Sequence, residues 1–220
     1  MERETGLGVK LIFFVLELTV AYCIKDFSIK SKFMNYFDNE KNVNDYISRT
    51  EGHDGKELIE ILHNYLPCNS TVLELGMGPG SDLNVLSRKY QVTGSDNSKL
   101  FLDRYRDIHK DSDLLFLDAI LIDTNKKFDC IYSHKVLHYF TDEELSQSFK
   151  RQYQVLENEG ILCHSFWYGE KIEEHLGRLN YYHTEENIKN IIYNNFDILE
   201  MERYEEIEKD DSIYVILEKL

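Results

Sequence analysis

From residue 39 to the C-terminus, short apolar runs of strand character alternate with segments of helical periodicity. The runs predicted to be strands are residues 71–75, 91–95, 114–117, 128–133, 161–167, 196–201 and 213–217. Strands that alternate with helices form a mainly parallel sheet covered by helices on both faces. The sequence therefore predicts an α/β fold, doubly wound around a seven-stranded sheet, with ligands bound beyond the carboxyl ends of the strands.

Several predicted helices carry start or stop signals. Apolar residues within 58–66 recur at helical spacing, and Pro67 ends that helix. Thr141 can cap a helix that begins at Asp142, while Glu144 reaches back as the second half of a capping box. These local signals support the alternation of helices and strands.

A glycine-rich turn, in the segment VLELGMGPG (residues 72–80), follows the first predicted strand. Its glycines, Gly76, Gly78 and Gly80, have the spacing G-x-G-x-G. Ser81 stands where the dinucleotide fingerprint G-x-G-x-x-G needs its third glycine, which disfavours nicotinamide cofactors. Such a turn lets the backbone approach a ligand closely, although glycines that serve only the turn conformation are an alternative.

Residues 74–80 resemble the first motif of the class I S-adenosylmethionine-dependent methyltransferases, and the likeness extends from about Val43 to the C-terminus. The resemblance implies a Rossmann-like fold with an antiparallel last strand, and S-adenosylmethionine as the cofactor. Residues 133–136 read Ser-His-Lys-Val instead of the Asn/Asp-Pro-Pro-Tyr/Phe motif of amino methyltransferases that act on nucleic acids. We therefore expect methyl transfer to a small-molecule acceptor. A catalytically inactive cofactor-binding sensor or partner subunit is the alternative.

By the same resemblance, residues that follow the predicted strands should contact the cofactor. Asp96 matches the acid that hydrogen-bonds the ribose hydroxyls, or else it caps a helix. Asp118 matches the acid near the adenine amino group, with Ala119 donating through its backbone, or else it is a turn residue. The expected cofactor-binding residues are Glu74, Gly76, Met77, Gly78, Gly80, Asp82, Asp96, Asn97, Asp118, Ala119, Ser133 and Tyr46.

Methyl transfer needs no nucleophilic side chain, because the sulfonium already makes the methyl carbon electrophilic. The protein has to hold donor and acceptor in line and exclude water. His138 and His134 are the candidate catalytic residues for a proton-bearing acceptor, with packing or hydrogen bonding as their alternative role. Residues 46–55 are predicted to form a lid, with a plain helix-loop-helix connection as the alternative. The residues expected near the acceptor are Arg49, His53, Trp167 and Tyr168.

The amino-acid composition limits which binding partners and which cellular location are expected. The excess of 40 Asp and Glu over 25 Lys and Arg gives a net charge of −15, which would repel a phosphate backbone, so no nucleic acid partner is expected. The cysteines lie too far apart for a zinc site or disulfide framework, which favours the cytoplasm. The histidines lack a zinc arrangement, and the acidic residues 205–211 are interpreted as a solvated hairpin turn. No metal is expected.

Residues 1–38 are predicted to be a helical N-terminal extension, and residues 39–220 the methyltransferase domain. The extension contains residues 11–24, which are apolar except for Glu17 and too short for a typical membrane span. We expect this segment to pack on the domain or to join two copies in a homodimer. Disorder, a translation-start artefact before Met34 and membrane attachment are the alternatives.

Overall fold

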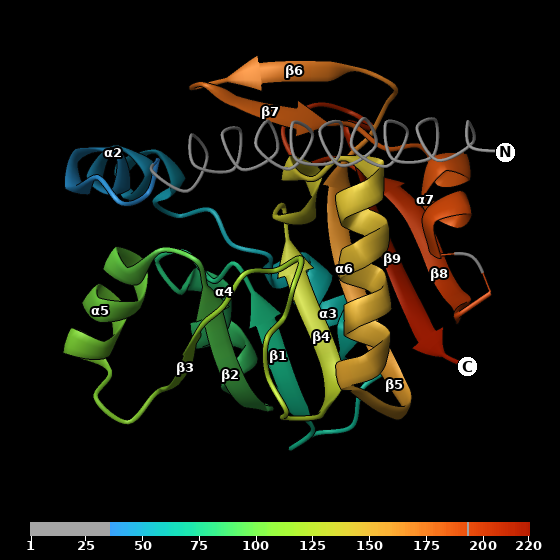
Figure 1. The fold of residues 1–220 in the computed structure, drawn as a ribbon, viewed down its shortest axis with the longest axis horizontal. Coiled ribbons are helices and arrows are strands. Elements are labelled where there is room, and N and C mark those ends of the chain that lie inside the picture. The colour runs from blue at the N-terminus through green and yellow to red at the C-terminus, as the bar shows by residue number, and fades with distance from the viewer. Residues whose placement is uncertain (1–35, 193) are drawn as a thin grey trace, which may run out of the picture.

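The computed structural model describes residues 36–192 and 194–220, and a seven-stranded sheet forms its centre (Figure 1). Across the sheet the strands follow the order β3-β2-β1-β4-β5-β9-β8. Strands β1 to β5 pair in parallel, whereas β9 is antiparallel to β5 and β8. The predicted fold, including its antiparallel last strand, is confirmed. The strands are β1 (Thr71–Leu75), β2 (Gln91–Asp96), β3 (Asp113–Phe116), β4 (Phe128–His134), β5 (Leu156–Trp167), β8 (Phe196–Tyr204) and β9 (Ser212–Lys219).

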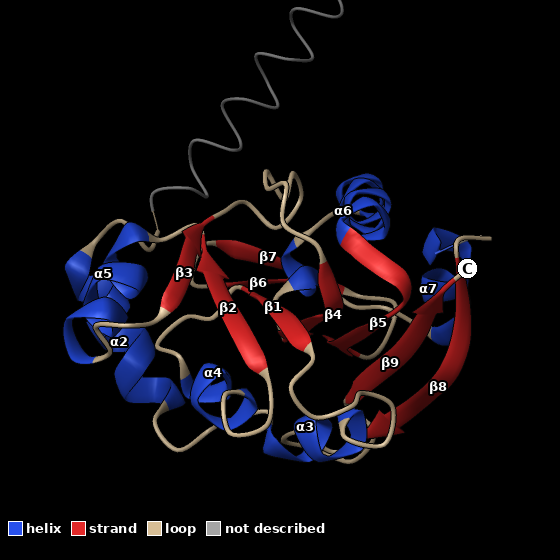
Figure 2. Cartoon of the chain, turned by 90° about the horizontal axis from the view of Figure 1, so that it is seen from below, coloured by secondary structure: helices blue, strands red, loops and turns tan. Residues whose placement is uncertain are grey.

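Helices cover both faces of the sheet, with α3 and α4 on one face and α6 and α7 on the other (Figure 2). The predicted capping box of α6 is present: Thr141 Oγ1 accepts from Glu144 N at 3.3 Å, and Glu144 Oε2 accepts from Thr141 N at 3.2 Å. The helices are α2 (Glu40–Thr50), α3 (Lys56–Leu62), α4 (Ser81–Leu86), α5 (Lys99–Ile108), α6 (Asp142–Val155) and α7 (Glu185–Ile192), with a short 3-10 helix η1 (Leu137–Tyr139).

The central strands are mostly buried and largely apolar because the helix layers cover both of their faces. Alternate residues of β1 pack into different clusters: Leu73 and Leu75 join the cluster beneath α6 and α7, and Val72 joins the cluster beneath α3. In β4, Ile131 and Cys130 divide in the same way. This two-sided burial holds the carboxyl ends of β1 and β4 side by side.

A two-stranded hairpin after β5 was not predicted from the sequence. Its strands, β6 (Ile172–His175) and β7 (Arg178–Tyr181), pair only with each other, beyond the carboxyl ends of the parallel strands at the top of Figure 1. All four residues of β6 are exposed, so the segment lacks the apolar alternation that identifies a strand. The hairpin is therefore visible only in the tertiary structure.

The prediction that residues 1–38 form a helical extension falls largely outside the described residues, as does dimerisation through that extension. Only its last three residues, 36–38, are described, and they form a bend and turn before α2. Over residues 36–192 and 194–220, none of the helices combines the length and apolar character that crossing a membrane requires.

Candidate active site

A cleft of about 700 Å³ opens beyond the carboxyl ends of β1, β4 and β5, where a doubly wound sheet binds its ligands. The glycine turn, the segments after β4 and β5, the β6–β7 hairpin and the β8–β9 loop form its wall. The structure thus brings together many of the predicted site residues. Those lining the cleft are Tyr46, Arg49, His53, Glu74, Gly76, Met77, Gly78, Asp82, His134, His138, Trp167 and Tyr168.

The glycine turn is closed by packing at one end and open at its middle. Gly80 has φ +89°, and a Cβ there would overlap the ring of Tyr105. Gly78 has φ +50°, and the nearest atom to a Cβ there would be Tyr46 Cε1 at 3.7 Å. The backbone at Gly78 therefore lines the cleft and leaves room for an added Cβ, with the Tyr46 ring at contact distance.

Glu74, at the end of β1, is a buried acid without a partner. It is 4% exposed, and its Oε2 has no hydrogen-bond partner among the described residues. Burial raises the pKa of Glu74 well above its usual range, and the negative charges of Asp82 and Asp96 act in the same direction. A cationic or hydrogen-bond-donating ligand group in the cleft would satisfy this carboxyl group.

Asp82, in the first turn of α4, is already well partnered. Its carboxylate accepts from Gly55 N at 2.6 Å and from the Tyr132 hydroxyl at 2.8 Å, and it lies 3.5 Å from His134 Nδ1. Burial would raise the pKa of Asp82, but His134 and these hydrogen bonds outweigh it and lower that pKa. Asp82 consequently joins the end of the predicted lid segment to α4 and β4.

His134 lies between two carboxylates. Its Nε2 is 3.2 Å from Glu206 Oε2, on the side opposite to Asp82. Burial would lower the pKa of His134, yet the hydrogen bonds and charges of both acids raise it to about 9. The imidazole therefore holds its proton at neutral pH and is poorly suited to accept another. The prediction of a solvated turn at 205–211 is wrong for Glu206, which is partly buried and lines the cleft.

The pKa of His138 is shifted in the opposite direction to that of His134. His138 is 2% exposed, and its Nδ1 has no partner among the described residues. Burial lowers the pKa of His138 well below its usual range, and the charges of Lys135 and Arg178 lower it further. The ring is neutral at physiological pH, and it contributes a buried ring nitrogen to the cleft wall.

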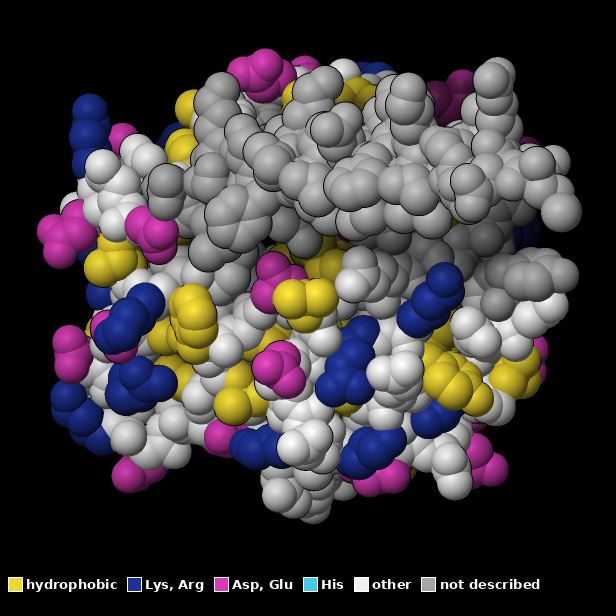
Figure 3. Space-filling view, viewed as in Figure 1, with side chains coloured by type: hydrophobic (Ala, Val, Ile, Leu, Met, Phe, Trp, Pro, Cys, Tyr) yellow, Lys and Arg dark blue, Asp and Glu magenta, His cyan; other side chains and the backbone are white. Residues whose placement is uncertain are grey.

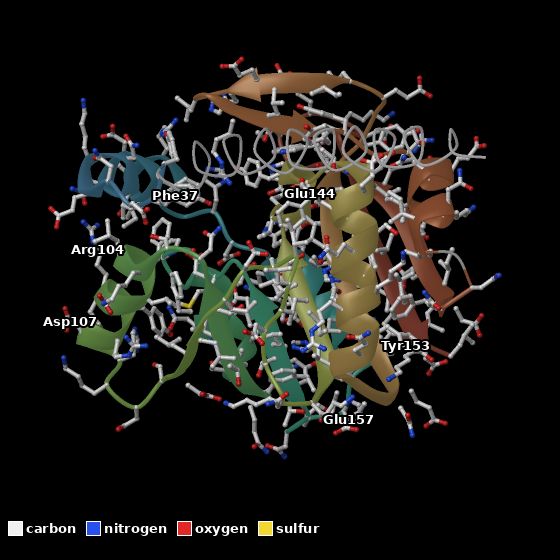
Figure 4. All side chains as sticks on the ribbon, in the orientation of Figure 1. Phe37, Arg104, Asp107, Glu144, Tyr153 and Glu157 are labelled. Carbon is white, nitrogen blue, oxygen red and sulfur yellow. The ribbon has the colours of Figure 1, made fainter. Side chains whose placement is uncertain are left out.

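Asp96 ends β2 beneath the glycine turn and does not line the cleft. Its Oδ2 accepts from Gly78 N at 2.9 Å, and its Oδ1 accepts from Ser98 N at 2.7 Å. Burial raises the pKa of Asp96, although these hydrogen bonds oppose the shift. Phe37 covers this region: its carbonyl accepts from Ser98 Oγ at 2.8 Å, its ring lies 5.2 Å from that of Tyr46, and Figure 4 shows it between α2 and α5.

Other predicted cofactor residues also lie away from the cleft wall. Asp118 Oδ1 accepts from the backbone N–H groups of Ile120 at 2.8 Å and Leu121 at 3.0 Å, which is the turn geometry that the sequence left as an alternative. Ser133 Oγ is bonded to His164 Nδ1 at 2.8 Å on the α6 side of the sheet. Gly80, Asn97 and Ala119 are likewise absent from the lining of the cleft.

Sequence reasoning missed several residues that line the cleft. Lys135 follows β4 with φ +54°, an uncommon conformation for a residue with a side chain, and its ammonium lies 3.8 Å from the centre of the Trp167 ring. Two more come from the unpredicted hairpin region: Glu173 lies in β6, and Tyr182 directly follows β7. Lys135 stands in a motif-bearing segment, but no local spacing rule identifies it.

Comparison with known proteins agrees with this geometry. Residues 72–160 match the family model described as a methyltransferase domain. No curated protein sequence matches the chain significantly.

Among solved structures, an S-adenosylmethionine-dependent methyltransferase from Clostridium acetobutylicum has a TM-score of 0.65 and 15% identity, over 81% of this chain and 98% of that one. One from Methanosarcina mazei has a TM-score of 0.63 and 17% identity, over 73% and 97%. A glycopeptide N-methyltransferase complexed with S-adenosyl-L-methionine has a TM-score of 0.62 and 16% identity, over 74% and 93%. Residues 72–160 therefore match a methyltransferase domain, and the chain has the fold of the class I S-adenosylmethionine-dependent methyltransferases.

Proposed function

We propose that residues 39–220 form a catalytic domain that binds S-adenosylmethionine in the cleft and transfers its methyl group to a small-molecule acceptor. The observation that carries the proposal is the unpartnered carboxyl group of Glu74 beside the open backbone of Gly78, within a matched methyltransferase domain. The amino group of the cofactor is a donor that suits Glu74, and Gly78 leaves room for a ligand against the turn. These residues therefore fit the cofactor.

Asp96 and the aromatic residues beside it are proposed to hold the nucleoside part. Asp96 Oδ2 accepts from Gly78 N, so the carboxylate is joined to the turn by a hydrogen bond. Tyr46 lines the cleft and is buried enough that its pKa rises to about 12, so it presents a neutral hydroxyl. We retain Asn97, Asp118, Ala119 and Ser133 as proposed contacts on the strength of the resemblance alone.

When bound, the cofactor supplies an electrophilic methyl carbon on a sulfonium. The chain holds the cofactor and the acceptor in line and excludes water from the cleft. The β6–β7 hairpin contributes Glu173, His175 and Asn180 to the cleft wall, and α2 contributes Tyr46 and Arg49. Both elements stand beyond the strand ends, so an acceptor that enters between them meets Trp167 and Tyr168 at the end of β5.

A small acceptor is favoured over a nucleic acid by size and charge. The cleft is about 700 Å³, within the range of small-molecule sites. In Figure 3, Lys and Arg side chains on the described part of the visible face are interspersed with Asp, Glu and apolar side chains and form no continuous basic surface. Two structural neighbours are a glycopeptide N-methyltransferase and an N-methyltransferase from Bradyrhizobium japonicum, both acting on nitrogen by their names.

Thermal unfolding with S-adenosylmethionine, S-adenosylhomocysteine and oxidised nicotinamide dinucleotide tests the cofactor. A ligand at 100 times its dissociation constant should stabilise the fold by about 2.7 kcal/mol. Stabilisation by the nicotinamide compound alone would overturn the proposal. Glu74→Gln, which keeps the shape of the side chain, should weaken binding, and Glu157→Gln on an exposed residue at the opposite end of the sheet is the matched control.

Turnover separates an enzyme from a cofactor-binding sensor. Metabolite extracts incubated with the full chain and methyl-labelled S-adenosylmethionine should yield a labelled product and S-adenosylhomocysteine. Binding of the cofactor without any labelled product from any extract would favour the sensor instead.

A further inference from the structure

Lys135 places an ammonium group in the acceptor end of the cleft. Its Nζ donates to the Phe166 carbonyl at 2.9 Å and to Ser212 Oγ at 2.5 Å, and its side chain is only 13% exposed. The nearest carboxylate oxygen, on Glu206, is 3.9 Å away, beyond hydrogen-bonding distance. Two of the three protons of an ammonium are therefore bonded within the described structure, and the third has no acceptor there.

Two aromatic rings lie close to Nζ and offer its third proton no hydrogen-bond acceptor. The Trp167 ring centre is 3.8 Å and the Tyr204 ring centre 5.2 Å from Nζ, so both rings can interact with a cation. Ser212 Oγ itself donates to Asp211 Oδ1 at 2.8 Å. The third proton has no acceptor among the described residues, so its loss breaks neither of the two hydrogen bonds that Nζ donates.

Burial of Nζ favours the neutral amine, and the nearby carboxylates oppose this effect only in part. Burial lowers the pKa of Lys135 to about 7, against the opposing charges of Glu206 and Asp211. Other titratable groups near it are His134, whose pKa is raised to about 9, His138, whose pKa is far below the usual range, and Tyr204, whose pKa burial raises above its usual range. One histidine is already protonated at neutral pH and the other is too weak a base, which leaves Lys135 as the base of matching strength.

We propose that Lys135 is a catalytic residue that takes the proton from a cationic amine acceptor; the inference rests on the proposed function and identifies its acceptor class. The ammonium of the acceptor gives one proton to the neutral Nζ of Lys135, and the freed nitrogen lone pair forms a bond to the methyl carbon. The carbon–sulfur bond breaks with its electron pair on sulfur, and the product leaves as a methylated ammonium. Lys135 then returns its proton to water.

The charges that line the acceptor end of the cleft favour a cationic amine as the acceptor. The carboxylates of Glu173, Glu206, Glu208 and Asp211 line this part of the cleft, against Lys135 and Lys171 as the lysines. Lys171 is already paired with Glu173 at 3.1 Å. An incoming cation therefore meets an excess of negative charge, and the aromatic face of Trp167 stabilises the charge once it has passed to Lys135.

Titration by competitive acetylation tests the state of Lys135 without any acceptor. The full chain, saturated with S-adenosylhomocysteine, is labelled with a trace of acetic anhydride between pH 5 and 11, and the peptides are quantified by mass spectrometry with the exposed Lys150 as reference. The pH midpoint of labelling does not depend on how accessible Lys135 is. Burial slows the labelling reaction without moving its midpoint. A midpoint near 7 is expected. A midpoint above 9 would overturn the proposal.

Lys135→Arg keeps the charge and the donors but stays protonated, whereas Lys150→Gln is a control on an exposed face. Lys135→Arg should bind S-adenosylhomocysteine within threefold of wild type and lose about 10²-fold or more of the transfer rate. A merely structural lysine would be rescued by arginine, so transfer by Lys135→Arg at the wild-type rate would reject the catalytic role.

The acceptor class is read from a metabolite extract divided on a cation exchanger. Labelled product should come from the retained, cationic fraction, at a rate that rises from pH 6 to 8 with wild type. Product only from the unretained fraction would reject the amine assignment. Failure of the chain to bind S-adenosylhomocysteine would instead reject the proposed function, so the binding measurement distinguishes the two failures.

Discussion

The backbone N–H of Gly78 donates to Oδ2 of Asp96 at 2.9 Å, and this bond joins the open point of the glycine turn to the end of β2. The two residues are far apart in sequence but adjacent in space because β1 and β2 pair in parallel, with Leu75 opposite Ser95. A ligand that lies against Gly78 is therefore close to a buried carboxylate.

Asp96→Ala should weaken S-adenosylhomocysteine binding by about tenfold to a hundredfold, because removing a charged acceptor costs about 1.5–3 kcal/mol per bond and frees the Gly78 turn. Isothermal titration calorimetry measures the effect. Asp107→Ala, which removes an exposed carboxylate from α5, is the control (Figure 4). Unchanged affinity in Asp96→Ala would mean that Asp96 does not contact the ribose or support the turn.

Gly80→Ala should destabilise the fold by about 2–5 kcal/mol. The left-handed conformation costs roughly 1–2 kcal/mol for a residue with a Cβ, and overlap with the Tyr105 ring adds about 1–3 kcal/mol. Gly52→Ala is a matched control, because Gly52 has φ +81° with nothing within 4 Å of the added Cβ. Urea unfolding of both variants separates the two contributions, and equal losses would mean that the Tyr105 ring moves aside at no cost.

The ion cluster of His134 should make stability fall as pH rises. The folded pKa of His134 is raised from 6.5 to about 9, so its contribution is complete below pH 6.5 and is lost between pH 6.5 and 9. The contribution of His134 to the free energy of unfolding is on the order of 3 kcal/mol. Because the pKa values of Asp82 and Glu206 are lowered, their contribution is lost at the acidic end instead.

The measurement is the unfolding free energy of wild type and His134→Gln at pH 6.5 and 9. The difference between the two proteins should shrink at the higher pH. Glu206→Gln removes one charge partner and should move the loss to lower pH. A difference that is constant across this range would place His134 outside the ion cluster.

His164 should make the stability of the fold decrease as pH falls, the opposite of the dependence expected for His134. It is fully buried, its Nε2 is 2.8 Å from Gln152 Oε1, and burial lowers its pKa from 6.5 to about 3. A neutral buried imidazole stabilises the fold above pH 6.5, and that stability is lost as pH falls towards 3, by up to about 1.4 kcal/mol per pH unit. His164→Gln should therefore show a flatter loss of unfolding free energy between pH 6.5 and 4.5. Parallel curves would show that His164 is protonated in the folded protein.

Local sequence patterns determined the sheet and its ligand-binding edge. The alternation of apolar runs predicted all seven sheet strands, and Thr141 with Glu144 predicted the start of α6, because strand burial and helix capping depend on residues within a few positions of one another. The glycine turn could be interpreted for the same reason. It also predicted the end of the cleft at which we propose that the cofactor binds, through residues that lie along one short segment.

Only the tertiary structure decided how the proposed acceptor end of the cleft is built. Lys135 meets Trp167 and Glu206 across three separate segments, and the hairpin above them is too exposed to show an apolar pattern. The pKa values of His134 and His138 are shifted in opposite directions although four positions separate them, because one lies between carboxylates and the other is buried away from them. Burial and charge depend on which segments come together, and that information is absent from local spacing.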